Sequence, residues 1–194
     1  DEENNFFGGS KKKFYLRKNS FYLSENIDHN LNSINNKVYV DKIKALKPDL
    51  IIVMGACLIS KEIINSSKHV INMHTGLSPY FRGGYANLWP ILTDEYGCFG
   101  VTIHEMSAGI DSGKIIYSGK PTILSNDNYG SINSKAIVLG TNLMIKTIKH
   151  IFNKNMNSKD QWTKGKIFHN YHFNNYIAYK YLKIRSSYLN SYIE

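Results

Sequence analysis

Three polar side chains in this sequence could cooperate in acid–base chemistry although they are separated along the chain. Asn72 and His74 stand two positions apart at the end of a short apolar run, residues 70–73. In an extended strand, positions i and i+2 point to the same side, which would place an amide beside an imidazole. Asp111 comes later, in a glycine-containing turn that also follows a predicted strand. If both strands end at the same edge of a sheet, the three groups meet there.

These residue types suit the transfer of an acyl group to an amine. Such a reaction passes through a tetrahedral oxyanion, where one preorganised hydrogen-bond donor is worth roughly a hundredfold to a thousandfold in rate. Asn72 could donate that hydrogen bond, and His74 could stabilise the oxyanion or move protons near neutral pH. Asp111 could orient the imidazole and help to remove the proton of the amine. Taken singly, an Asn-x-His pair is typical of a loop and an Asp between glycines of a turn.

The elements that must position these residues alternate between strands and helices. Apolar runs predict strands at residues 50–54, 70–73, 100–106 and 114–118. Helical spacing and caps predict helices at residues 41–47, 61–67 after the N-cap Ser60, 85–93 with an interruption at Pro90, and 131–152. This alternation predicts an α/β fold with a Rossmann-like, mainly parallel sheet flanked by helices, in which residues 50–54 form a buried strand. Residues 75–84 are expected to be a loop.

The length and charge of the chain indicate one domain with an appendage. Its 194 residues suit an α/β domain at residues 1–152, with the first β-α unit missing or altered, and a basic, aromatic, irregular C-terminal extension at residues 153–194. Residues 146–194 hold nine Lys and Arg against two acids, so most of the net charge of +9 lies there. Either this tail binds an anionic partner or it is a solvated, lysine-rich surface.

Several protein classes are disfavoured by composition. The two cysteines, Cys57 and Cys98, form no disulfide framework, so we expect reduced thiols and a cytoplasmic location. No run reaches the ~18 apolar residues of a membrane helix. No HExxH metal motif, nucleophile elbow or phosphate loop occurs, so we expect no metal. The chain begins at Asp1 rather than Met, so either it is a processed or truncated product or its ordered residues simply start there.

Three separated blocks resemble, in order, the catalytic domain of the formyltransferase family. They are Asn72-x-His74-x-x-x-x-Pro79-x-x-Arg82-Gly83, then Gly100-Val-Thr-Ile-His104, then Gly109-Ile-Asp111-Ser-Gly113. That family includes formyltransferases of glycinamide ribonucleotide, methionyl-tRNA and amino sugars, and formyltetrahydrofolate deformylase. The resemblance spans roughly residues 48–122. It implies an enzyme that uses N10-formyltetrahydrofolate as formyl donor and Asn72, His74 and Asp111 as its catalytic trio.

The resemblance also implies where the ligands bind. The folate pocket maps to two segments, which hold Met54, Gly55, Ala56, Cys57, Leu58 and Ile59 in the first and Ala108, Gly109 and Ile110 in the second. Their apolar side chains and glycines suit a flat ring, although the first segment also fits plain core at a strand end. The acceptor amine would meet Thr75, Gly76, Tyr80 and Arg82, unless Arg82 clamps its own loop. His104 is expected to be structural.

Several functions stay open at this stage. The block at residues 74–83 looks closer to the sugar N-formyltransferases than to the tRNA and purine enzymes, which favours a small amine acceptor such as a nucleotide-linked amino sugar. The alternatives are the deformylase, the tRNA or glycinamide ribonucleotide enzyme, and an inactive fragment. A nucleic-acid-binding module is less favoured, because no RNA-binding motif accompanies the basic tail. Tyrosines of the tail could pack back onto the domain or against a second subunit of a homodimer.

Overall fold

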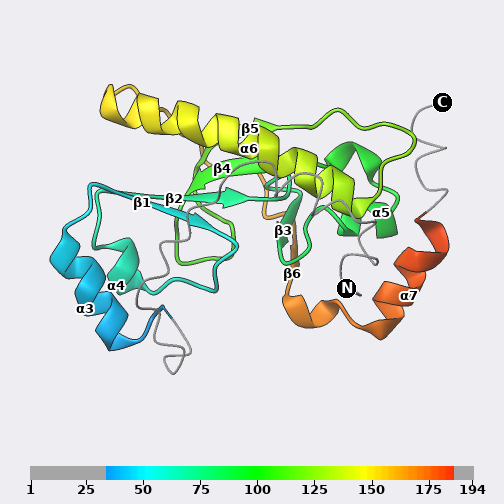
Figure 1. The fold of residues 1–194 in the computed structure, drawn as a ribbon, viewed down its shortest axis with the longest axis horizontal. Helices are drawn as coiled ribbons and strands as arrows, with labels where there is room; N and C mark the ends of the chain where they lie inside the picture. The colour runs from blue at the N-terminus through cyan, green and yellow to red at the C-terminus, as the bar shows by residue number, and fades with distance from the viewer. Residues whose placement is uncertain (1–33, 186–194) are drawn as a thin grey trace, which may run out of the picture.

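The computed structural model describes residues 34–185, and a four-stranded sheet lies at their centre. The strand order is β1-β2-β4-β5, with β1 at Leu50–Met54, β2 at His69–His74, β4 at Val101–Glu105 and β5 at Ile115–Gly119. Helices lie on one face and at both ends of this sheet (Figure 1). The α/β class and the four predicted strands are therefore confirmed.

The expected direction of the strands is wrong for part of this sheet. β1 and β2 are parallel, but β4 runs antiparallel to both β2 and β5. Residues 75–100 form a long excursion that returns the chain to the end of the sheet where β2 finishes, and a turn at residues 106–114 reverses it again. Apolar alternation identifies a segment as a strand and leaves its direction open, because both pairings bury the same face.

The burial of β1 also differs from expectation. Among the described residues β1 pairs with β2 only, and the side chains of Ile52 and Met54 are 47% and 44% exposed. β2, by contrast, is buried along nearly its whole length because it lies between β1 and β4. The apolar composition of a strand thus predicts a strand, while its place in the sheet decides how deeply it is buried.

The long helix α6 (Tyr129–Phe152) covers one face of the sheet. It begins at Asn128, whose side chain accepts a hydrogen bond from the backbone of Ser131 while the Ser131 hydroxyl accepts one from the backbone of Asn128. Such a capping box fixes the start of a helix. A cluster of apolar side chains from α6, β2 and β4 joins the two layers, namely Ile71, Met73, Val101, Ile103, Ala136, Met144 and Ile151. Gly140 permits this approach, since a Cβ there would lie 2.5 Å from Met73 Sδ.

The shorter helices flank the ends of the sheet. α3 (Lys37–Leu46) and α4 (Lys61–Ile64) lie beside β1, and Ser60 caps α4 as predicted. α4 is a single turn, shorter than expected. α5 (Trp89–Leu92) is also a single turn. Pro90 lies in the first turn of this helix, where proline is tolerated, and so does not interrupt a longer helix as expected.

The chain after α6 is more regular than expected. β6 (Lys166–Phe168) pairs in parallel with β3 (Phe81–Gly83), a strand inside the region predicted to be a loop. After the 3-10 turn η2 (Asn170–His172), α7 (Asn175–Ile184) packs near α5 at the end of the molecule away from α3 (Figure 1). The domain boundary at residue 152 stays a prediction. The proposed missing β-α unit falls before residue 34, outside the described residues.

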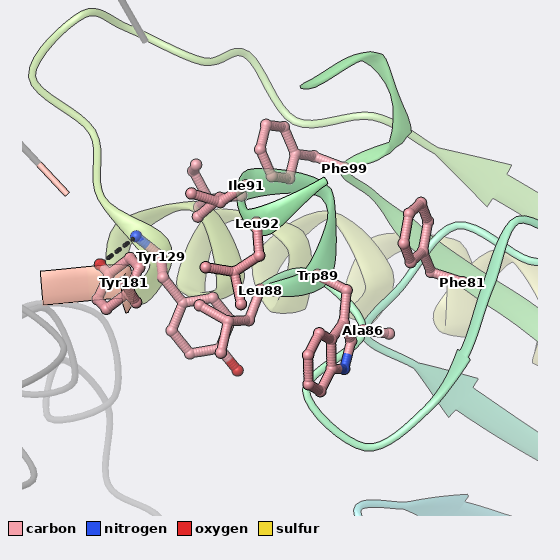
Figure 2. Packing of buried hydrophobic residues seen from close by; sticks show 10 residues of the cluster. Phe81, Ala86, Leu88, Trp89, Ile91, Leu92, Phe99, Tyr129 and Tyr181 are labelled. Atoms are coloured by element: carbon pink, nitrogen blue, oxygen red, sulfur yellow. Dashed lines mark hydrogen bonds between the residues drawn. The ribbon is translucent and has the colours of Figure 1, made fainter. Parts of the chain in front are cut away.

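A second apolar cluster ties α7 to the rest of the molecule. Tyr181 is fully buried, and its hydroxyl accepts a hydrogen bond from the backbone N–H of Tyr129 at 3.2 Å (Figure 2). It lies among side chains from β3, α5, α6 and the loops between them, namely Phe81, Ala86, Leu88, Trp89, Ile91, Leu92, Phe99, Tyr129 and Ile132. This part of the tail therefore packs back onto the α/β unit, one of the two arrangements expected for its tyrosines.

Some of the basic residues of the tail also take part in packing. Lys166 pairs with Glu95, Lys180 donates to the carbonyl of Leu92 at 3.3 Å, and Lys183 lies over the ring of Tyr179. Between residues 34 and 185, no helix has the length and apolar character that crossing a bilayer requires.

Truncation of Tyr181 should show how much the tail contributes to stability. Tyr181→Ala is expected to lower the free energy of unfolding by about 3 kcal/mol or more, because it leaves a cavity in the cluster. The matched control is Tyr179→Ala on the same helix, where the side chain is 55% exposed. Urea unfolding measures both, and equal values for the two variants would contradict the packing described here.

Candidate active site

The polar residues of the site lie on the face of the sheet opposite α6. Along β2, Ile71 and Met73 point toward α6, so Asn72 and His74 point away from it. Thr102 and His104 of β4 share that second face, and Asn72 and His104 are direct neighbours in the strand pairing. The sheet therefore separates an apolar side from a polar side by simple alternation.

Asp111 reaches this face from the turn after β4. Because β4 is antiparallel to β2, its carboxyl end lies at the opposite edge of the sheet from the carboxyl end of β2. The expectation that Asp111 meets Asn72 and His74 because both strands end at the same edge is therefore wrong. The turn at residues 106–113 instead folds back over the face, and Asp111 adopts a left-handed backbone conformation with φ of 42°. The convergence predicted for the three residues is observed, although the route to it is different.

The carboxylate of Asp111 lies at the centre of the polar cluster. Asn72 Nδ2 donates to Asp111 Oδ1 at 3.0 Å, and the backbone N–H of Gly83 donates to Asp111 Oδ2 at 2.8 Å. The ring nitrogens His74 Nδ1 and His104 Nε2 each lie 3.3 Å from one carboxylate oxygen. Three strands, β2, β3 and β4, thus supply groups that face one buried acid.

His104 belongs to this cluster, although the sequence indicated only a structural histidine. It is 1% exposed, and its Nδ1–H donates to the carbonyl of Glu105 at 2.7 Å. Its Nε2 lies 3.2 Å from Asn72 Nδ2 and 3.3 Å from Asp111 Oδ1, so it accepts from the amide or, when the ring carries a second proton, donates to the carboxylate. The signal available beforehand was its alternation with Thr102 and its place at the end of the second family block.

The two ring nitrogens of His74 both face acceptors. Nε2–H donates to the backbone carbonyl of Phe81 at 3.0 Å, and Nδ1 faces Asp111. Burial lowers the pKa of His74, and the attraction of the Asp111 carboxylate offsets that effect only in part. The charge of Asp111 therefore stabilises a second proton on this ring, whereas the loss of solvent around the ring destabilises it.

The acid itself is held ionised. Burial alone would raise the pKa of Asp111, but the charge of His74, the hydrogen bond to His104 and the N–H of Gly83 together lower it to about 2. At neutral pH the cluster thus presents a carboxylate whose hydrogen-bond partners are already in place. A fixed negative charge of this kind can stabilise positive charge that develops beside it.

A cavity of about 440 Å³ adjoins this cluster. Asn72, His74 and Asp111 line it. So do all nine residues predicted to bind the folate, namely Met54, Gly55, Ala56, Cys57, Leu58, Ile59, Ala108, Gly109 and Ile110. The volume falls within the range of small-molecule sites. Two segments from different ends of the sheet thus form walls of one cavity.

The four residues predicted to bind the acceptor do not all line the cavity. Thr75 lines the cavity, whereas Gly76, Tyr80 and Arg82 are not among its walls. Gly76 leaves room for the imidazole of His74, since a Cβ there would lie 2.4 Å from His74 Nε2. Tyr80 stacks edge-on against Trp162. Arg82 is buried, and its Nε has no hydrogen-bond partner. Their roles in acceptor binding stay predictions.

The cavity also has walls that sequence reasoning missed. Phe168, His169 and Asn170 reach it from the tail, because the pairing of β6 with β3 brings them beside Gly84 and Tyr85. Asn133 and Ile137 reach it from α6. No local pattern could have located them, since their positions depend on long-range packing. Within residues 34–185, no cluster of His, Cys, Asp and Glu is arranged to hold a metal ion.

Known proteins share this sequence and fold. A model of the formyl transferase family matches residues 11–148. A methionyl-tRNA formyltransferase from Clostridium beijerinckii is 33% identical over 114 residues, which cover 58% of this chain and 37% of the relative. The chain thus spans about two fifths of the length of the curated relatives it matches.

Solved structures of formyltransferases have a similar fold. A 4-N formyltransferase from Francisella tularensis aligns over 95% of this chain and 73% of its own, with a TM-score of 0.65 and 22% identity. The formyltransferase PseJ from Anoxybacillus kamchatkensis, in complex with UDP-4,6-dideoxy-4-formamido-L-AltNAc and tetrahydrofolate, aligns over 72% of this chain and 71% of its own, with a TM-score of 0.60 and 26% identity.

Acid titration should reveal the environment of Asp111. Because its folded pKa of about 2 lies below the ordinary 3.8, Asp111 contributes stability above pH 3.8 that is lost as the pH falls through the folded value. The difference in unfolding free energy between the wild type and Asp111→Asn should therefore shrink as the pH is lowered from about 5 toward 2. Urea unfolding across that range measures it, and a difference independent of pH would contradict this account.

Proposed function

Because the chain belongs to the formyl transferase family, we propose that it transfers a formyl group from N10-formyltetrahydrofolate to a primary amine. The observation that supports this most directly is the convergence of Asn72, His74 and Asp111 at a cavity whose walls include every residue predicted to hold the folate. The new bond joins the amine nitrogen to the formyl carbon as the bond between that carbon and N10 breaks.

The cavity suits a folate in its chemistry. Its first segment offers the apolar side chains of Met54 and Leu58, both well exposed and available to contact a ring. The loop at Ala108, Gly109 and Ile110 forms another wall beside the catalytic carboxylate. Peptide groups of both loops would supply the directional hydrogen bonds that a pterin requires, and tetrahydrofolate is part of the PseJ complex.

Proton movement is assigned to His74 and Asp111 together. A carboxylate with a pKa of about 2 is a weak base, so Asp111 serves mainly to attract the amine and to stabilise positive charge. His74 Nδ1 lies beside that carboxylate and is the site for the proton released by the amine, because the negative charge of Asp111 stabilises the protonated ring. The charged ring would then be held between Asp111 and the carbonyl of Phe81.

Asn72 is assigned to the formyl oxygen. In this structure both of its amide hydrogens are directed inward, at Asp111 Oδ1 and at His104 Nε2. A hydrogen bond from Asn72 to the substrate must therefore replace one of these two. Such exchange is common, because catalytic hydrogen bonds often reach their final geometry only in the reacting complex.

For the acceptor, we propose the amino group of a nucleotide-linked sugar. The UDP-linked sugar in the PseJ complex supports this choice, as does the form of the block at residues 74–83. A second candidate is the amino group of methionyl-tRNA, which the identity to methionyl-tRNA formyltransferases and the positive charge of residues 146–194 favour. The two acceptors differ enough in size and charge for a direct comparison.

Replacement of the catalytic pair should abolish transfer and spare folate binding. His74→Ala and Asp111→Asn are each expected to lower kcat by about a hundredfold or more, because each removes a group that acts on the reacting atoms. The affinity for 5-formyltetrahydrofolate should change only a few-fold, since the apolar walls are intact. The assay follows labelled formyl groups from the donor into a UDP-linked amino sugar or methionyl-tRNA.

The matched control is Asp41→Asn, which removes an exposed carboxylate on α3 that is not among the cavity walls. It should behave like the wild type. Release of formate without any amine would identify the protein as a deformylase. Full transfer activity in His74→Ala would refute the assignment of the site.

The two thiols offer a separate test of the folate cavity. Cys57 is exposed and lines the cavity, whereas Cys98 lies elsewhere, and burial raises the pKa of its thiol. Saturating 5-formyltetrahydrofolate should slow the reaction of N-ethylmaleimide with Cys57 and leave Cys98 unaffected, as followed by mass spectrometry. An unchanged rate at Cys57 would place the folate elsewhere, and Cys57→Ser confirms which peptide is modified.

A further inference from the structure

The backbone at the catalytic acid adopts a conformation that side-chain-bearing residues rarely choose. Asp111 has φ of 42°, in the left-handed region that favours glycine. It stands next to Ser112 and Gly113 in a turn whose own hydrogen bonds include one between the hydroxyls of Ser107 and Ser112. Such a conformation persists only where surrounding contacts hold it.

One contact that holds it comes from a residue fifty positions later in the chain. Gln161 Nε2 donates one hydrogen bond to the carbonyl of Asp111 at 2.7 Å and another to the carbonyl of Gly113 at 2.9 Å. These two carbonyls flank the strained turn. Both amide hydrogens of Gln161 are thus used to clamp the backbone on either side of Ser112.

The orientation of Gln161 is determined by these two bonds. Its Oε1 is buried and has no hydrogen-bond partner, so the reversed amide would set an oxygen against two carbonyl oxygens. A buried acceptor without a partner is unfavourable, so the two hydrogen bonds donated by Nε2 must compensate for it. A purely space-filling residue at this position would not need an amide.

The segment that carries Gln161 is anchored to the same hairpin. Lys159 exchanges two backbone hydrogen bonds with Ile115, at 2.8 and 2.9 Å. Ser158 Oγ donates to Glu105 Oε1 at 2.7 Å. The chain after α6 is therefore fastened to β4 and β5 immediately before it reaches the catalytic turn, which gives Gln161 a fixed base.

We propose that Gln161 is a positioning residue that holds the catalytic turn so that the carboxylate of Asp111 faces His74. The inference rests on the proposed formyl transfer, which it deepens. Asn72 and Gly83 fix the carboxylate end of the side chain, and Gln161 fixes its backbone end. Without the clamp the turn can relax toward negative φ, and the carboxylate leaves the 3.3 Å contact with His74.

The test compares Gln161→Met, which keeps a similar volume and removes both donors, with Gln161→Asn, which is too short to reach both carbonyls. Each should lower kcat by about tenfold to a hundredfold, with KM for the donor and acceptor changed little, because misplacement of a reacting group acts on the chemical step. The matched control, Asp160→Asn, changes the neighbouring residue, whose side chain is 84% exposed, and should retain kcat within about twofold.

A second readout does not depend on activity. The imidazole 15N signals of His74, assigned with His74→Ala, should shift in both Gln161 variants toward those of Asp111→Asn, because each change removes the carboxylate from the ring. Asp160→Asn should leave them in place. If the wild type transfers no formyl group, the proposed function fails while this comparison still tests Gln161.

Wild-type kcat together with an unshifted His74 signal in Gln161→Met would overturn the proposal. So would a loss of thermal stability with kcat per folded molecule unchanged, which would make Gln161 a merely structural residue. If Gln161→Met does not fold, Gln161→Asn, which retains a polar side chain, decides between these outcomes.

Discussion

A charged carboxylate inside a protein must be surrounded by donors and opposite charge, and the structure around Asp111 is organised by that requirement. The backbone of Gly83 and the side chains of Asn72, His74 and His104 all face it. These groups come from β2, β3 and β4, so the side chain of Asp111 joins three strands. The low pKa of Asp111 is the electrostatic result of that arrangement.

The sheet supports this centre by separating two environments. Alternate residues of β2 and β4 bury apolar side chains beneath α6 and present Asn72, His74, Thr102 and His104 to the other side. The apolar side supplies the rigidity that a catalytic site needs, because closely packed side chains resist displacement. Gly140 contributes by allowing α6 to approach Met73 closely.

The chain after α6 contributes residues to the cavity and to the turn that carries Asp111, which its composition did not indicate. β6 pairs with β3 and brings Phe168, His169 and Asn170 to the cavity, while Tyr181 completes the apolar cluster around α5. Gln161 reaches the turn that carries Asp111. A segment whose composition predicts a basic, irregular tail therefore contacts the turn that carries Asp111 and forms part of the cavity wall.

The local sequence alone determined the four strands of the central sheet, the start of α4 at Ser60, the long helix α6, and the three residues that meet at the cavity. Each depends on periodicity, capping or a family block, which act over a few residues. The direction of β4, the exposure of β1, the place of His104 beside Asn72, and the reach of Gln161 and His169 were decided only by the tertiary structure. Their physical cause is the pairing and packing of distant segments, and neither pairing direction nor burial depth is encoded in a residue's immediate neighbours.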